Sequence, residues 1–171
     1  VSPLGQDQGL RFKRGRIGHR LLQLLPDVAV AERAATAARL LANPLHGLAP
    51  ADQAALASEV LAVLNEPAFA AVFAPGSRAE VPVAGQLGEV AISGQIDRLA
   101  IAGDEVLIVD FKTNRPPPAH PADVSPAYRA QLALYKAVLS GVFPGKTVRC
   151  ALLWTDGPRL MPMPDELLAL P

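Results

Sequence analysis

The chain has 171 residues, 50% of them hydrophobic, which is enough for one core, and we expect a single domain over residues 1–171. Its single cysteine excludes intrachain disulfides, thiolate zinc cages and iron–sulfur clusters, and the absence of an apolar run near the roughly 20 residues that span a bilayer predicts a cytoplasmic protein with no membrane partner. Sixteen basic and sixteen acidic side chains cancel, so the net charge by itself does not favour nucleic-acid binding.

The first part of the chain, about residues 14–73, is predicted to be helical. Its polar start has no initiator methionine, and we expect it to be cut from a longer polypeptide. Apolar spacing, proline and possible cap residues mark four helical segments. These are residues 16–25, ended by Pro26; 27–42, capped by Asp27; 51–64, opened by Pro50; and a short turn at 68–73.

Basic residues gather on the first predicted helix. Arg11, Lys13, Arg14, Arg16 and Arg20 fall within ten positions that contain no acid. Such a cluster suits contacts with DNA phosphates, for which Arg14 and Arg16 are our candidates. An exposed basic face, or a contact with a neighbouring domain, explains the cluster equally well.

The second part, about residues 78–163, is predicted to form a sheet with one helix. Alternation and β-branched residues indicate successive strands, and a proline-rich loop at 114–121 separates them from a helix that Ser125 and Pro126 begin and Gly141 ends. The expected strands are 79–83, 89–101, 105–112, 147–154 and an edge strand at 160–163, followed by a short terminal helix. This order indicates an α/β fold.

Two carboxylates and a lysine are predicted to meet at one end of a hairpin. Asp110 and Lys112 are two apart on an otherwise apolar strand and therefore project to the same face. A turn at Gly103 brings Asp97 level with Asp110. Carboxylates so close repel unless a cation lies between them, which favours a hard divalent ion such as Mg²⁺. An ion-pair cluster with Arg98 explains the same spacing.

Several segments resemble the motifs of a known family. SGQIDRL, LIVDFKTNRP and QLALY resemble successive motifs of RecB-like nucleases in the PD-(D/E)XK superfamily, most closely the C-terminal nuclease domain of bacterial AddA-type helicase–nuclease subunits. RGRIGHRLLQLLP is similar to the first motif of that family and GSRAEVPV to the segment before the hairpin. The resemblance covers about residues 14–167. It implies the PD-(D/E)XK core of helix, three-strand meander, helix and strand, with an inserted helical segment after the first helix.

The resemblance also implies roles for individual residues. The metal ligands would be His19, Asp97, Asp110 and the backbone carbonyl of Phe111, and Lys112 would be the catalytic lysine; Glu80, Gln131 and Tyr135 would support the site or contact DNA. Phe111 stands where the family commonly has tyrosine. Each supporting role has a structural alternative: His19 as a core-edge residue, Gln131 and Tyr135 as a helix hydrogen bond, and Glu80 as an exposed strand acid.

The implied function is a Mg²⁺-dependent DNA exonuclease, with Mn²⁺ as a substitute ion, in a helicase–nuclease that processes double-strand breaks for recombinational repair. Implied partners are DNA, a helicase region of the same full-length chain and a second subunit of the AddB type. Alternatives are a silent DNA-binding or docking module and a cluster-free stand-alone exonuclease. Residues 141–147 resemble an ATP-binding phosphate loop but have three residues between the glycines instead of four, so no ATP site is expected here.

Overall fold

The computed structural model describes residues 3–114, 116–155 and 158–170, and the side chains from residue 13 onward. The chain divides into two compact units, Val1–Pro67 and Ala68–Pro171. The first is helical and the second holds the sheet, so the boundary lies near the predicted change of pattern after residue 73. A single nuclease domain over both units stays a prediction.

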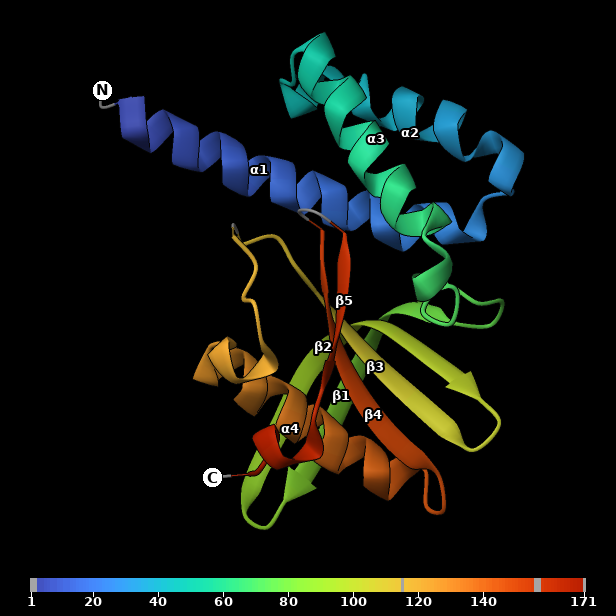
Figure 1. Cartoon of the computed structure of the whole chain (residues 1–171), viewed down its shortest axis with the longest axis vertical. Coiled ribbons are helices and arrows are strands. Elements are labelled where there is room, and N and C mark those ends of the chain that lie inside the picture. Colours follow the sequence, from blue (N-terminus) through green and yellow to red (C-terminus); the bar gives the residue numbers. More distant parts are fainter. Residues whose placement is uncertain (1–2, 115, 156–157, 171) are drawn as a thin grey trace. The chain divides into compact units, whose positions relative to one another are not determined.

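The first unit consists of three helices joined by 3-10 turns (Figure 1): α1 (Pro3–Leu24), α2 (Arg33–Leu41) and α3 (Pro50–Asn65). Its core is aliphatic, and α1 and α3 approach closely at Gly18, where an added Cβ would lie 3.2 Å from Leu56. Helix α3 agrees with the prediction. No helix in the described part of the chain is long and apolar enough to cross a membrane.

Two predicted boundaries in this unit are wrong. Helix α1 begins at Pro3 rather than Arg16, because the polar stretch before Arg16 contains no internal proline and Pro3 occupies a first-turn position that tolerates it. Asp27 does not cap α2 but lies in the 3-10 turn Leu25–Asp27. The Arg33 side chain donates to the carbonyls of Pro26 and Val28 at 3.0 and 3.1 Å, which favours turns over this segment and delays the helix.

The second unit is a five-stranded sheet in the order β1-β2-β3-β4-β5 (Figure 1). Strand β3 is central and runs parallel to β4, and the other neighbours are antiparallel. The bounds are β1 (Arg78–Leu87), β2 (Val90–Ala102), β3 (Glu105–Lys112), β4 (Thr147–Trp154) and β5 (Arg159–Met163). The predicted meander, central strand and edge strand are confirmed, although β1 is longer than expected.

Helix α4 (Pro126–Val142) connects β3 to β4 and packs on the sheet. Ser125 caps it by accepting a hydrogen bond from the backbone N–H of Tyr128 at 3.3 Å. The helix ends one residue beyond the predicted Gly141. The segment that resembles a phosphate loop therefore leads from a helix into a strand, the reverse of the order found around nucleotide-binding loops.

Candidate functional site

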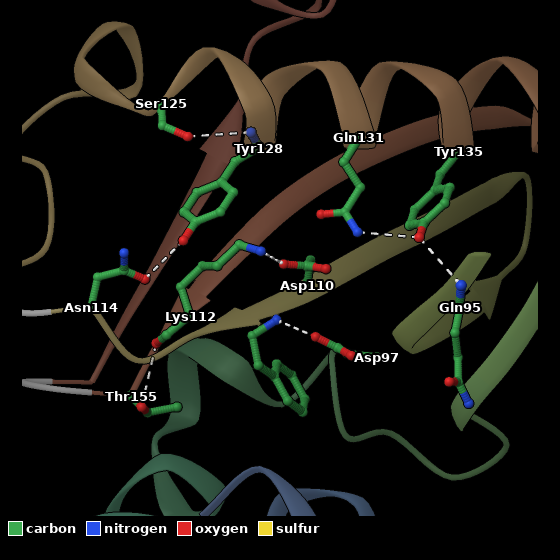
Figure 2. A network of polar contacts seen from close by, with 11 residues as sticks. Gln95, Asp97, Asp110, Lys112, Asn114, Ser125, Tyr128, Gln131, Tyr135 and Thr155 are labelled. Atoms are coloured by element: carbon green, nitrogen blue, oxygen red, sulfur yellow. Dashed lines mark hydrogen bonds and ion pairs between the residues drawn. The ribbon is translucent and has the colours of Figure 1, made fainter. Parts of the chain in front are cut away.

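The C-terminal end of β3 carries a buried ion pair. Asp110 is only 4% exposed, and the Nζ of Lys112 contacts its Oδ2 (Figure 2). The two residues share a face because side chains alternate along a strand. The Lys112 carbonyl accepts a hydrogen bond from the Thr155 N–H at 3.0 Å, which fixes this end of β3 to the chain beyond β4.

Asp97 approaches the same place from β2. The register of β2 and β3 pairs Arg98 with Val109, and one further step places Asp97 opposite Asp110. The Oδ2 of Asp97 accepts a hydrogen bond from the Phe111 N–H at 2.7 Å. The structure thus brings together both carboxylates and the lysine on adjacent strands (Figure 2).

Tyr128 and Asn114 complete this cluster, and sequence reasoning did not find them. The Nζ of Lys112 lies 3.8 Å from the centre of the Tyr128 ring, and the Tyr128 hydroxyl donates to Oδ1 of Asn114 at 3.1 Å. A helical signal was present in the sequence, because Tyr128 precedes Gln131 by three residues and Tyr135 by seven and so shares their helix face.

Gln131 and Tyr135 lie one turn apart on α4 and are hydrogen-bonded to each other. The Tyr135 hydroxyl accepts hydrogen bonds from Nε2 of Gln131 and from the backbone N–H of Gln95, both at 3.2 Å (Figure 2). Gly94 is needed here, since an added Cβ would lie 2.3 Å from that hydroxyl. Buried Tyr135 therefore seats α4 on β2, and half-buried Gln131 is the member of the pair nearer to solvent.

Glu80 lies in line with the two aspartates. The register of β1 and β2 pairs Ala79 with Arg98 and Val81 with Ile96, so Glu80 is the residue opposite Asp97. Its φ of 54° is the only positive value at a non-glycine residue in the described chain. Left-handed backbone at such a residue costs free energy and is common at functional sites. In backbone register, three acids therefore follow one another across β1, β2 and β3.

Arg98 follows Asp97 on β2 and therefore projects to the opposite face of that strand. Arg98 is 1% exposed, and its Nε and Nη2 donate to the Ser77 hydroxyl at 3.0 and 2.8 Å. Its guanidinium lies 5.7 Å from the centre of the Phe73 ring, and that ring lies 6.3 Å from the ring of Phe111. Through these contacts, Arg98 and Phe111 hold the segment that precedes β1, which includes Phe73 and Ser77.

Three further candidates lie on α1, in the first unit. Arg14 contacts two acids of α3, Glu59 at 2.7 Å and Asp52 at 3.9 Å, so its charge is largely compensated within that unit. Arg16 is exposed, His19 is half-buried, and the side chain of Arg11 lies outside the described residues. A metal-binding role for His19 would require the first unit to contribute to a site built in the second, and it stays a prediction.

Comparison with known proteins gives the family. Residues 3–160 match the PD-(D/E)XK nuclease superfamily. The chain belongs to this superfamily. No curated protein matches. Two solved structures are similar, each at 14% identity and a TM-score of 0.36: protein VC1899 from Vibrio cholerae, with 97% of this chain and 50% of that one covered, and SSO0001, with 95% and 81% covered. The chain thus spans half of the first of these.

Membership of the PD-(D/E)XK superfamily confirms the predicted α/β core and indicates a hydrolase that cleaves phosphodiester bonds. Divalent metal is typical of this superfamily, and the donor chemistry here fits a hard ion. Asp97 and Asp110 supply carboxylate oxygens. The Lys112 carbonyl points toward Thr155, away from β2. Because backbone carbonyls alternate between the two sides of a strand, the Phe111 carbonyl points to the β2 side, as does the Phe111 N–H, which donates to Asp97. As arranged, no three His, Cys, Asp or Glu side chains among the described residues form a complete metal site.

Proposed function

We propose that the chain is a metal-dependent DNA nuclease whose site lies at the C-terminal end of β3. The observation that supports this proposal best is the approach of Asp97 and Asp110 on neighbouring strands, with Lys112 held against one of them. An ammonium buried with a carboxylate costs desolvation free energy that hydrophobic packing at the same place would avoid. A function that needs both charges explains their retention.

Each residue has a distinct role in the proposed reaction. Asp97, Asp110 and the Phe111 carbonyl would hold Mg²⁺, with Mn²⁺ as a substitute. When bound, the ion would supply positive charge that makes a water more acidic and stabilises the leaving oxygen. Lys112 adds a fixed ammonium beside the phosphoryl group as negative charge develops there. The Phe111 N–H holds Asp97 in orientation, and Thr155 holds the backbone of Lys112.

We further propose that this domain acts as an exonuclease within a helicase–nuclease that processes DNA breaks for recombinational repair. The support is the order of the motifs around Asp97, Asp110 and Gln131, which resembles that of AddA-type nuclease domains. Its partners would be DNA, a helicase region of the same full-length protein and an AddB-type subunit. Arg16 is exposed and therefore more available to a phosphate than Arg14, which is paired with Glu59.

Cleavage assays on the purified chain test this proposal. Linear duplex, linear single-stranded and closed circular DNA are incubated with Mg²⁺ or EDTA, using the wild type, Asp97→Asn, Asp110→Asn and the control Asp104→Asn in the hairpin turn. We expect Mg²⁺-dependent loss of linear DNA, and a fall of at least about 100-fold in the two site variants, since ligand loss forfeits several kcal/mol of stabilisation. Cleavage by Asp110→Asn at the wild-type rate would contradict the mechanism. Equal cleavage of circular DNA would contradict an exonuclease.

A silent DNA-binding or docking module is the competing function. Titration calorimetry with Mn²⁺ separates the two, because a docking module has no reason to bind the ion through Asp97 and Asp110. We expect heat of binding in the wild type that Asp110→Asn removes. DNA binding without ion binding would favour the silent module.

A further inference from the structure

The ammonium of Lys112 has two partners, one on each side. Asp110 contacts it from β3, and the ring of Tyr128 lies 3.8 Å away on α4 (Figure 2). A cation within about 6 Å of an aromatic ring centre is attracted to the ring face, more strongly when both are shielded from water. The Lys112 side chain is 12% exposed, so the contact is well shielded.

Tyr128 is itself held at its backbone and at its hydroxyl. Its backbone N–H bonds to the Ser125 cap, and its hydroxyl donates to Asn114, two residues beyond Lys112. The ring also packs against the hydrophobic core of the second unit. Tyr128 is therefore a fixed surface for the ammonium.

Metal binding makes the second partner important. A divalent ion bound to Asp110 would occupy the carboxylate that the Lys112 ammonium contacts in this structure. The two cations would then repel each other. We propose that Tyr128 is a positioning residue for Lys112, whose ring face keeps the ammonium beside the carboxylates when Asp110 no longer holds it. This inference rests on the proposed function for its purpose, but the contact itself can be tested without metal.

Stacking of a DNA base on Tyr128 is the main alternative role for an aromatic residue near a nuclease site. Lys112 already covers one face of the ring, and the core of the second unit receives part of it. A stacking residue would affect the KM for DNA and would act independently of Lys112. A positioning residue affects kcat and acts only through the lysine.

Kinetics in a double-mutant cycle distinguish these roles. Tyr128→Phe keeps the ring and Tyr128→Leu removes it, and each is combined with Lys112→Met. We expect kcat to fall about three- to tenfold in Tyr128→Leu with KM unchanged, and by less than about twofold in Tyr128→Phe, from the usual strength of cation–π contacts. In Lys112→Met, Tyr128→Leu should change nothing further. An additional loss there, or a raised KM, would overturn the inference.

A spectroscopic measurement decides the same point without activity. Asp110→Asn removes the carboxylate partner, and nitrogen-15 NMR then reports whether the Lys112 ammonium is still held. We expect its signal to persist in Asp110→Asn and in its combination with Tyr128→Phe, and to be lost with Tyr128→Leu. Persistence with Tyr128→Leu, in a protein with unchanged circular dichroism, would overturn the inference. Failure of the wild type to bind Mn²⁺ or cleave DNA would instead refute the proposed function.

Discussion

The two ends of the β2–β3 hairpin carry the same kind of ion pair in opposite surroundings. At the turn, which Gly103 closes with a φ of 55°, Arg149 contacts Glu105 at 2.8 Å with side chains 63% and 59% exposed. At the other end, Lys112 contacts Asp110 with side chains 12% and 6% exposed. Water and salt screen the first pair, whereas the second has lost most of its hydration. Burial, more than the presence of opposite charges, therefore distinguishes the proposed site.

Removal of the buried ammonium tests this difference most strongly. We expect Lys112→Met to lower DNA cleavage by about 100-fold or more, the usual effect of losing a positioned group that stabilises developing charge. It also leaves the Asp110 carboxylate buried without its cation, which typically costs about 3–5 kcal/mol of stability. Thermal unfolding and cleavage assays measure the two effects.

Divalent ions provide the control for this variant. Because Mg²⁺ restores a positive charge beside Asp110, it should raise the Tm of Lys112→Met more than that of Lys146→Met, a substitution near the exposed end. If Mg²⁺ raised the Tm of neither variant, no ion would bind at the buried pair.

Arginines on the same sheet give the second test. Arg98 is 1% exposed and bonds twice to Ser77, whereas Arg149 is exposed and contacts Glu105. We expect Arg98→Met to lower the free energy of unfolding by about 2 kcal/mol, since hydrogen bonds from charged groups contribute about 1.5–3 kcal/mol. Arg149→Met is the matched control. Urea denaturation measures both, and equal midpoints would contradict a supporting role for Arg98.

Much of the site was predictable from the symmetry of the hairpin. Residues equidistant from the Gly103 turn face one another, and this spacing alone predicts that Asp97 lies beside Asp110. The apolar run that precedes Asp110 likewise predicts a central strand, because a strand buried on both faces must be apolar on both. Local patterns therefore determine the strands and the carboxylate pair.

Contacts between distant segments were not predictable. The approach of Tyr128 to Lys112 depends on how α4 crosses the sheet, and the close contact of Tyr135 with Gly94 likewise joins residues far apart in sequence. The positive φ of Glu80 is similarly invisible, because glutamate has no preference for left-handed backbone. Alternation along the strand predicts the face that Arg98 occupies, but it does not predict that Ser77 accepts the hydrogen bonds of Arg98.

Cys150 lies midway between the two ends, on β4 beside Ile108, and gives a smaller, pH-dependent effect. Burial raises the pKa of its thiol to about 12 from the usual 9.0. The unfolded chain ionises first as pH rises, so stability is intact below pH 9.0 and falls between 9.0 and about 12, by roughly 1.4 kcal/mol per pH unit from this group. Urea denaturation at pH 8 and 10 should show this loss, and Cys150→Ala should reduce it. If the stability of Cys150→Ala fell between pH 8 and 10 as much as that of the wild type, the loss could not be assigned to Cys150.

The exposed pair should give the smallest effect. The hydrogen bond that Arg149 donates to Glu105, together with the charge of Glu105, raises the pKa of Arg149, so the guanidinium stays charged at neutral pH. Water solvates either charge almost as well when its partner is gone, and we expect Glu105→Gln or Arg149→Gln to change the Tm by no more than about 1 °C. High salt should leave the Tm of each variant close to that of the wild type. A larger fall in Tm, of the size expected for Lys112→Met, would mean that burial does not distinguish the two ion pairs. The burial of Lys112 and Asp110 would then no longer support a function for that pair.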